Sequence, residues 1–329
     1  MRVVITGGAG FLGSRLARAL LARGSLAGPD GAQRPIERLV VVDLVRAEGL
    51  SDPRVEVVAG DLTDDGLLRR ALGPDAASIF HLAAVVSAQA EADLDLGMRV
   101  NLDATRRLLD ACRALPRPPR LVATSSVAVY GGALPDPVTD DTALRPQSSY
   151  GAQKAILELL VSDYARRSLV DGRVLRLPTV SVRPGRPNKA ASSFASGIIR
   201  EPLAGVEAVC PVTADTRVWI LSPRRAVEGL VRGHELDAAA LGGVRTVNLP
   251  GLSVTAAEMV AALGEVAGPA AAARVRWEPD ALVQRIVGSW PARWDASRAR
   301  ALGFEADPDF QSVIRAHVAD ELGGKLARG

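Results

Sequence analysis

The sequence predicts a doubly wound α/β fold, in which helices cover both faces of a parallel sheet. Two observations support this prediction. First, short runs rich in Val, Ile and Leu alternate with helical patterns through the first half of the chain. Second, these runs are apolar at successive positions, which is typical of strands buried on both faces. The predicted strands are 2–6, 39–43, 55–59, 78–82, 120–125 and 173–177.

The predicted helices lie between these strands, at 11–23, 64–72, 92–115 and 148–168. After Pro178 the pattern changes, because prolines become frequent and the helical stretches shorten. We therefore expect a Rossmann domain over residues 1–180 and a smaller, partly interleaved C-terminal region over 181–329. A strand near 244–249 is expected to rejoin the first domain. In such sheets the ligand lies beyond the carboxyl ends of the strands.

The composition is that of a globular protein and argues against several functions. Of the 329 residues, 48% are hydrophobic and 23% are charged, and the net charge is only +3. Basic residues are scattered and aromatic residues make up 4%, which argues against a nucleic-acid-binding surface. The two cysteines and three histidines do not form a disulfide framework or a metal-site pattern. The chain shows no signal peptide or membrane-spanning run, so we expect a cytoplasmic protein with no membrane partner.

A phosphate-binding turn is predicted between the first strand and the first helix, in the sequence TGGAGFLG from Thr6 to Gly13. Gly7 permits the tight turn, Gly10 lets the backbone approach a pyrophosphate, and Gly13 lets the helix pack close to the strand. The N-terminus of the helix would then offer free amides and a positive dipole to the phosphates. The strand–turn–helix context therefore predicts a dinucleotide site.

Asp43 ends the second strand, where a carboxylate can accept hydrogen bonds from the adenosine ribose and repel a 2′-phosphate. This favours NAD over NADP, although Arg46 nearby leaves NADP open. The separation from the glycine turn exceeds the usual ~20 residues. An insert over 24–35, expected to be a surface loop, explains the excess. Asp61 is placed to bind the adenine amino group or to lie in the N-cap region of the next helix, and Ala83 to lie beside the cofactor ribose.

A tyrosine and a lysine lie four residues apart on one predicted helix, in the pentad YGAQK, so Tyr150 and Lys154 share a face. A free tyrosine has a pKa near ~10, too high for a general base at neutral pH. The lysine ammonium and a positive nicotinamide ring favour the phenolate, so we expect them to lower this pKa. Three hydroxyl side chains end the fifth strand, and one would stabilise the substrate oxygen beside Tyr150. Ser126 is our first choice for this residue and Ser125 the second.

These motifs, with DLTD, HLAA, NLDATRRLLDAC and TSSVAVYG in order between them, resemble the extended short-chain dehydrogenase/reductase family. The resemblance is specific over residues 1–185 and thinner beyond them. It implies an NAD-dependent oxidoreductase whose catalytic residues are Ser126, Tyr150 and Lys154, and a homodimer formed by the third and fourth predicted helices. The cofactor contacts that we expect are Gly7, Gly10, Phe11, Leu12, Gly13, Asp43, Asp61, Leu62, Ala83, Asn101, Tyr150, Lys154 and Pro178.

Most members of this family act on nucleotide-sugars, but two features of this chain point elsewhere. No acid directly follows Ser126, which disfavours a dehydratase. The stretch DTRVWILSPRR replaces one that nucleotide-sugar enzymes commonly carry, with only Arg217 matching. The segment 182–212 instead resembles a subgroup, the NAD-dependent D-erythronate dehydrogenases. Alternatively, its part over 191–199 is only a covering helix that packs small residues. The substrate contacts that we expect are Ser87, Ser126, Tyr150, Ser192, Ser193 and Arg217.

The predicted activity is the oxidation by NAD of a secondary hydroxyl of a small sugar acid, most specifically D-erythronate to its 2-keto acid. Tyr150 takes the hydroxyl proton, Ser126 holds the oxygen, and Lys154 tunes Tyr150. Two alternatives stay open. One is a nucleotide-sugar 4-epimerase that retains NAD tightly, and the other is a non-catalytic NAD-sensing protein.

Overall fold

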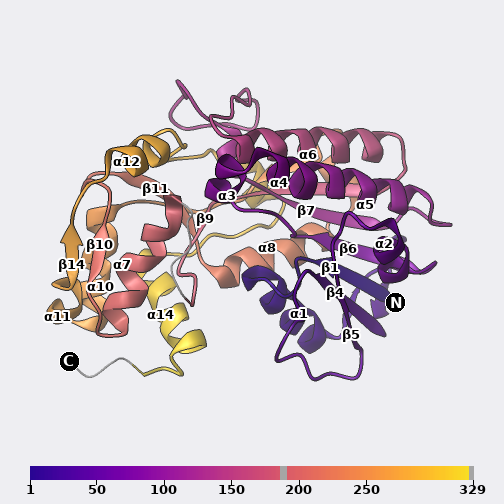
Figure 1. The fold of residues 1–329 in the computed structure, drawn as a ribbon, viewed down its shortest axis with the longest axis horizontal. Coiled ribbons are helices and arrows are strands. Elements are labelled where there is room, and N and C mark those ends of the chain that lie inside the picture. The colour runs from indigo at the N-terminus through magenta and orange to yellow at the C-terminus, as the bar shows by residue number, and fades with distance from the viewer. Residues whose placement is uncertain (186–190, 326–329) are drawn as a thin grey trace. The chain divides into compact units, whose positions relative to one another are not determined.

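The computed structural model describes residues 1–185 and 191–325, and the chain divides into two compact units. Unit 1 comprises Met1–Ser126, Ser148–Arg176 and Val227–Val247. Unit 2 comprises Val127–Gln147, Leu177–Ala226 and Asn248–Gly329. Each unit is therefore built from segments that are distant in the sequence, as the colours of Figure 1 show.

Unit 1 contains a seven-stranded sheet with the order β12-β8-β7-β6-β1-β4-β5. The strands are β1 (Arg2–Thr6), β4 (Arg38–Asp43), β5 (Val55–Ala59), β6 (Ala76–His81), β7 (Arg120–Ser126), β8 (Asp171–Leu177) and β12 (Thr246–Asn248). Strand β1 pairs in parallel with both β4 and β6, and the chain winds outward from β1 in both directions. The predicted doubly wound class is confirmed, and its change of winding direction lies at β1, where such sheets bind ligands.

Helices connect these strands and cover the sheet. They are α1 (Phe11–Arg23), α2 (Asp65–Leu72), α3 (Ser87–Ala92), α4 (Leu94–Gly97), the π-helical η1 (Met98–Asp103), α5 (Ala104–Arg113), α6 (Ser149–Arg166), α8 (Pro223–Glu235) and α9 (Ala238–Leu241). Figure 1 shows α5 and α6 side by side along the sheet. Because α6 follows β7 in unit 1, its first turn is brought to the carboxyl end of that strand.

The structure differs from the sequence prediction at two places in unit 1. The helix predicted over 92–115 is interrupted at Asp93, whose carboxylate accepts a hydrogen bond from the Leu96 amide at 2.9 Å and so starts a new helix. The loop predicted over 24–35 is a hairpin of β2 (Ser25–Ala27) and β3 (Gln33–Pro35). Gly31, with a φ of +80°, permits the tight turn that lets these strands pair.

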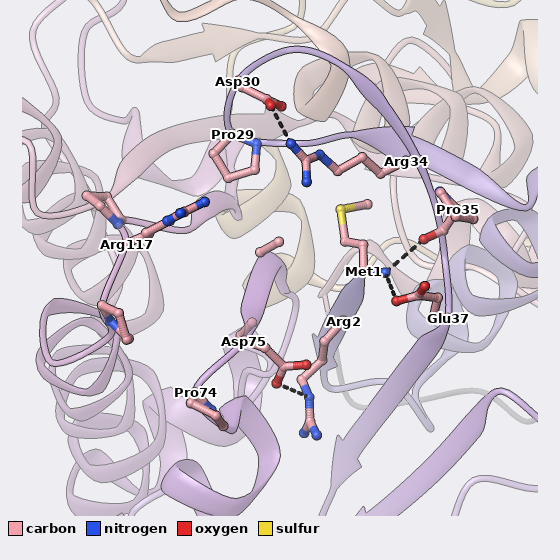
Figure 2. Close-up of a pocket in the computed structure, with 14 residues that line it drawn as sticks. Met1, Arg2, Pro29, Asp30, Arg34, Pro35, Glu37, Pro74, Asp75 and Arg117 are labelled. Atoms are coloured by element: carbon pink, nitrogen blue, oxygen red, sulfur yellow. Dashed lines mark hydrogen bonds and ion pairs between the residues drawn. The ribbon is translucent and has the colours of Figure 1, made fainter.

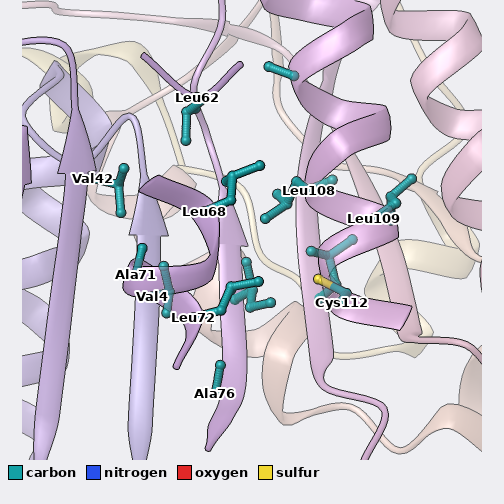
Figure 3. Close-up of a cluster of buried hydrophobic side chains, with 14 of the residues drawn as sticks. Val4, Val42, Leu62, Leu68, Ala71, Leu72, Ala76, Leu108, Leu109 and Cys112 are labelled. Atoms are coloured by element: carbon teal, nitrogen blue, oxygen red, sulfur yellow. The ribbon is translucent and has the colours of Figure 1, made fainter. Parts of the chain in front are cut away.

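The core of unit 1 lies between the sheet and the helices α2, α5 and α6 (Figure 3). Val4 from β1, Leu68 and Leu72 from α2, and Leu108 from α5 are all at most 1% exposed. Burial of each such side chain contributes about 1.5–3 kcal/mol. Cys112 lies in the same cluster, where burial raises the pKa of its thiol. This packing fixes the strand ends from which the predicted site residues project.

Unit 2 contains two small sheets and a helical layer. The sheet β13-β11-β9 is formed by Leu252–Thr255, Arg217–Leu221 and Thr179–Val180, and β10 (Ala208–Cys210) pairs with β14 (Val275–Trp277). The helices are α7 (Phe194–Leu203), α10 (Ala256–Ala267), α11 (Pro269–Ala272), α12 (Ala281–Gly288), α13 (Ser297–Ala301) and α14 (Phe310–Glu321), with short 3-10 turns η2 (Val127–Val129) and η3 (Ala191–Ser193). Ile198, Met259 and Ile314 are fully buried in its core.

The two units alternate along the chain, whereas the sequence-based division places the main boundary at residue 180 and returns only the strand near 244–249 to the first domain. The strand expected near 244–249 is β12, which lies at the edge of the sheet beside β8. The assignment of cofactor binding to the first part and substrate binding to the second stays a prediction. Within 1–185 and 191–325, each helix is too short or too polar to cross a bilayer.

Candidate active site

The glycine turn between β1 and α1 has no room for a side chain at Gly7, Gly8 or Gly13. Gly7 has a φ of +71°, and a Cβ there would lie 2.6 Å from the backbone nitrogen of Ala83. A Cβ at Gly13 would collide with the carbonyl oxygen of Gly7. Gly10 is the exposed N-cap of α1, and no side chain caps this helix. The amides at the start of α1 can therefore bind an anion, as the pyrophosphate of a dinucleotide requires.

Asp43, at the end of β4, lies against this turn. Its Oδ2 accepts a hydrogen bond from the Ala9 amide at 3.0 Å. The next residues, Leu44 and Val45, are 67% and 63% exposed, and Arg46 is exposed as well. The structure thus brings the carboxylate to the glycine turn and leaves the surface beside it open, which fits an adenosine ribose.

Asp61 follows β5 and has its own local partners. Its Oδ1 accepts hydrogen bonds from the amide and the hydroxyl of Thr63, both at 2.8 Å. The Thr63 amide is the main reason why the pKa of this carboxyl lies below its ordinary value. Asp64, whose carboxylate accepts from the Gly66 and Leu67 amides, is the N-cap residue of α2. Asp61 is therefore ionised and adjacent to the helix start without capping it.

Asn101 lies in η1 and is 1% exposed. Its Oδ1 accepts from the Val85 amide at 2.8 Å, and its Nδ2 donates to the Val85 carbonyl at 3.1 Å and to Gln153 Oε1 at 2.7 Å. The side chain thus fixes the segment after β6 and uses both Nδ2 hydrogens, so a direct cofactor contact without loss of a bond would have to use the second lone pair of Oδ1. The other predicted cofactor residues are Phe11 and Leu12 in the first turn of α1, Leu62 in the core of unit 1, Ala83 after β6, and Pro178 in unit 2.

The structure brings the three predicted catalytic side chains together at the carboxyl end of β7. Tyr150, in the first turn of α6, is hydrogen-bonded to Ser126, the last residue of β7. Lys154, one turn further along α6, has its Nζ 5.8 Å from the centre of the Tyr150 ring. The same Nζ donates a hydrogen bond to the carbonyl oxygen of Thr124 at 3.0 Å. The phenol therefore lies next to both a hydroxyl and a buried ammonium.

Burial governs the charges of this group. It raises the pKa of Tyr150 to about 12, although the hydrogen bond with Ser126 acts in the opposite direction. Burial also lowers the pKa of Lys154 to about 8, while the Glu158 carboxylate favours the ammonium. Desolvation thus outweighs the Ser126 hydrogen bond in the cofactor-free chain, and the predicted fall of the Tyr150 pKa, which includes the charge of the nicotinamide ring, stays a prediction. Phenolate formation therefore depends on a further positive charge, such as a bound nicotinamide ring.

Ser125, the second choice for the catalytic hydroxyl, has a different partner. Its hydroxyl donates to Glu158 Oε1 at 2.5 Å. The same carboxylate accepts two hydrogen bonds from Arg176, at 2.9 and 2.6 Å. Sequence reasoning missed Glu158, although its position one turn after Lys154 was a signal that could have been followed.

The predicted substrate residues are divided between the units. Ser87 begins α3 in unit 1, whereas Ser192 and Ser193 lie in η3 of unit 2. Arg217 begins β11 in unit 2, where it donates to the Ser253 carbonyl at 3.0 Å and pairs with Glu258 at 3.5 Å. Residues 186–190, part of the segment that carries the subgroup resemblance, lie outside the described residues.

A pocket of about 860 Å³ opens at the other end of the sheet, among the residues that precede its strands (Figure 2). The Met1 ammonium donates to Glu37 at 2.6 Å, Arg2 pairs with Asp75 at 2.9 Å, and Asp30 pairs with Arg34. The two charges within each of these ion pairs neutralise each other. The pocket lies at the start of β1, away from the glycine turn. It is therefore distinct from the candidate cofactor site.

Comparisons with known proteins show the family of the chain. The model of the NAD dependent epimerase/dehydratase family matches residues 3–220, and the chain belongs to this family. The D-erythronate dehydrogenase of Cupriavidus necator is 64% identical over 320 residues, which is 97% of this chain and 98% of that protein. The D-erythronate dehydrogenase of Haemophilus influenzae is 45% identical over 323 residues, 98% of this chain and 100% of that protein.

A solved structure is also similar along the whole chain. The crystal structure of the nucleoside-diphosphate-sugar epimerase from Agrobacterium tumefaciens is 44% identical, with a TM-score of 0.92, and the match covers 99% of this chain and 95% of that one. The predicted class, an oxidoreductase of the extended short-chain dehydrogenase/reductase type that uses a nicotinamide cofactor, is confirmed.

Proposed function

We propose that the chain oxidises a secondary hydroxyl of a small sugar acid with NAD, and that D-erythronate, converted to its 2-keto acid, is the substrate. The observation that carries this proposal is the grouping of Ser126, Tyr150 and Lys154 at the end of β7. The names of two relatives that align along nearly the full length, at 64% and 45% identity, support the choice of substrate.

In this proposal the chemistry is divided among three side chains. Tyr150 accepts the proton of the substrate hydroxyl as a general base. Lys154, an ammonium at neutral pH with its pKa of about 8, stabilises the phenolate and can bind the nicotinamide ribose. Ser126, already hydrogen-bonded to Tyr150, stabilises the charge that develops on the substrate oxygen. Bound NAD supplies the hydride acceptor and the positive ring that favours the phenolate.

NAD is proposed as the cofactor because of Asp43. Its carboxylate lies against the glycine turn through the Ala9 amide, where it can accept from ribose hydroxyls and repels a 2′-phosphate. The substrate contacts Ser87, Ser192, Ser193 and Arg217 are proposed with it. For Arg217, a substrate carboxylate would have to compete with Glu258, which is its present ion-pair partner.

A homodimer and a cytoplasmic location complete the proposal. Leu94 of α4 and Leu159 of α6 are 56% and 68% exposed, and Met98 and Ile156 are each 37% exposed. Apolar side chains on neighbouring helices of unit 1 support a contact with a second copy. Both cysteines are unpaired, which is consistent with a reducing compartment.

The proposal is tested by the absorbance of NADH, with NAD and a panel of four-carbon sugar acids that includes D-erythronate and its stereoisomers. We expect D-erythronate to give the highest kcat/KM. In Tyr150→Phe we expect kcat to fall about 10²–10⁴-fold, the usual contribution of a general base. Normal turnover in this variant would contradict the mechanism.

The 44% identity to the nucleoside-diphosphate-sugar epimerase from Agrobacterium tumefaciens favours a second candidate, a nucleotide-sugar 4-epimerase. An epimerase returns the hydride to its product, so it would form no net NADH and would retain NAD through purification. NAD binding without turnover of either class of substrate would instead indicate a sensor.

A further inference from the structure

A buried acid outside the predicted catalytic residues lies one helical turn beyond Lys154. Glu158 is 3% exposed, and α6 places it on the same face as Tyr150 and Lys154, at intervals of four residues. A carboxylate at this depth needs donors that replace its lost hydration, and an unpaired one would be strongly destabilising. The identity of its donors therefore indicates what the residue does.

Both oxygens of Glu158 accept hydrogen bonds, and the donors come from two strands. Oε1 accepts from the Ser125 hydroxyl at 2.5 Å and from Arg176 Nε at 2.9 Å. Oε2 accepts from Arg176 Nη2 at 2.6 Å. Ser125 belongs to β7 and Arg176 to β8. The carboxylate thus ties α6 to both strands at once.

This connection is adjacent to the reacting groups on the strand and on the helix. On β7, Ser125 lies between Thr124 and Ser126. Ser126 is hydrogen-bonded to Tyr150, and the Thr124 carbonyl accepts a hydrogen bond from Lys154. On α6, Glu158 is one turn from Lys154. A displacement of β7 along α6 would therefore disturb the contacts of Tyr150 and Lys154 together.

We propose that Glu158 is a positioning residue for Ser126, Tyr150 and Lys154, which holds the end of β7 against α6 and keeps a negative charge opposite the Lys154 ammonium. This inference rests on the proposed function of those three residues. Its two parts, a mechanical tie and a counter-charge, come from the same carboxylate and can be measured separately.

The counter-charge follows from the groups that face Lys154. On α6 these are Tyr150 and Glu158, and on β6 His81. His81 is uncharged, because burial and then the Lys154 ammonium lower its pKa to about 3. Glu158 is thus the acid that favours the ammonium, and it also neutralises Arg176. Its removal would withdraw this favourable charge, which would lower the Lys154 pKa further.

The chain makes a direct measurement practical, because it has only three lysines, Lys154, Lys189 and Lys325. Isotope-labelled lysine should give three side-chain NMR signals in the cofactor-free protein, and Lys154→Met assigns one of them. We expect this signal to titrate near pH 8 in the unaltered chain. In Glu158→Gln we expect the midpoint to fall by about one pH unit or more, as loss of a charge at this depth implies.

Asp163→Asn is the matched control, since Asp163 is also an acid of α6 but is exposed and pairs with Arg166. It should leave the Lys154 titration and the turnover unchanged. An unchanged Lys154 midpoint in Glu158→Gln would overturn the inference. A Glu158→Asp variant keeps the charge but withdraws it from Ser125. Normal turnover in this variant would also overturn the inference. This second variant decides the matter if the Gln variant does not fold.

Turnover separates this inference from the proposed function. We expect Glu158→Gln to lower kcat about tenfold or more at neutral pH. The KM for D-erythronate should stay within about twofold, because proton transfer and not substrate binding is affected. Normal turnover in Tyr150→Phe would overturn the Ser-Tyr-Lys mechanism alone, because the NMR result on Lys154 does not require turnover. A catalytic loss in Tyr150→Phe without a Lys154 shift in Glu158→Gln would overturn the positioning role alone.

Discussion

Two adjacent serines at the end of β7 have different hydrogen-bond partners and therefore different roles in this site. Ser126 is hydrogen-bonded to the Tyr150 phenol, whereas the hydroxyl of Ser125 donates to Glu158 at 2.5 Å. One therefore touches the group that we propose to react, and the other supports the helix that carries it. The two positions can be compared directly, because both are serines in the same strand.

We expect Ser126→Ala to lower kcat by about 10²–10³-fold, the usual effect of removing one donor to a developing oxyanion. Ser125→Ala should lower kcat by roughly three- to tenfold, since the Glu158 carboxylate keeps its two bonds to Arg176 and loses one neutral donor. Steady-state kinetics on the two variants checks this order. Equal losses would contradict the distinction between them.

The residues of the site differ in how far the sequence could predict them. Tyr150 and Lys154 follow from a four-residue helical spacing, and Ser126 from its place at a strand end. Glu158 could not be assigned in the same way, because its partners Ser125 and Arg176 come from two other strands. The rise of the Tyr150 pKa in the cofactor-free chain could not be predicted either, because the extent of burial is a tertiary property.

At the scale of elements, the turn between β1 and α1 depends on two close backbone contacts. Gly7 adopts a φ of +71° against the backbone of Ala83, and Gly13 packs against the carbonyl oxygen of Gly7. The start of α1 is thereby held close to β1, with its amides uncapped by any side chain. This geometry, and not the glycines as such, is what a pyrophosphate would require.

A methyl group at Gly13 should therefore displace the turn. We expect Gly13→Ala to lower the free energy of unfolding by about 1–3 kcal/mol and to weaken NAD binding about tenfold or more. Gly243→Ala is the control, because no atom lies within 4 Å of a Cβ at that position. Chemical denaturation and cofactor titration measure both effects. Equal NAD affinity in the two variants would contradict the proposed cofactor site.

The elements that the sequence predicted well are those whose signals are local. The strands of the sheet follow from apolar runs, α1 from a helical stretch after a glycine turn, and α6 from the helical stretch that carries Tyr150 and Lys154. The interruption at Asp93 depends on which amide its carboxylate meets, and the hairpin over 24–35 on pairing between its two ends. Both features depend on contacts between particular atoms of the folded chain, which the pattern of apolar and polar residues does not specify.

At the scale of the whole molecule, unit 1 contains two buried histidines whose charge state links stability to pH. Burial is the main reason why the pKa of His81 is lowered to about 3 and that of His234 to about 4. His81 lies between Thr6 and Thr105, and His234 is hydrogen-bonded to Ser78 at 2.8 Å. Both are therefore neutral in the folded chain at neutral pH.

The unfolded chain binds protons at these histidines below about pH 6.5, whereas the folded chain does not until the pH reaches their lowered values. The contribution of the two neutral histidines to the free energy of unfolding is therefore fully present above about pH 6.5 and is lost as the pH falls. We expect each histidine to lower the free energy of unfolding by about 2 kcal/mol at pH 5 relative to pH 8. Denaturation at both pH values, with His234→Gln, checks this. The difference should be about 2 kcal/mol smaller in the variant, and an equal difference would contradict it.

The central claim is that the chain performs a net oxidation, and the most direct test is the number of NADH molecules formed per D-erythronate consumed. We predict one NADH for each D-erythronate in the unaltered protein, with the signal lost in Tyr150→Phe. Consumption of D-erythronate without NADH would contradict the account. No consumption by a protein that retains NAD would also contradict it and would favour the epimerase.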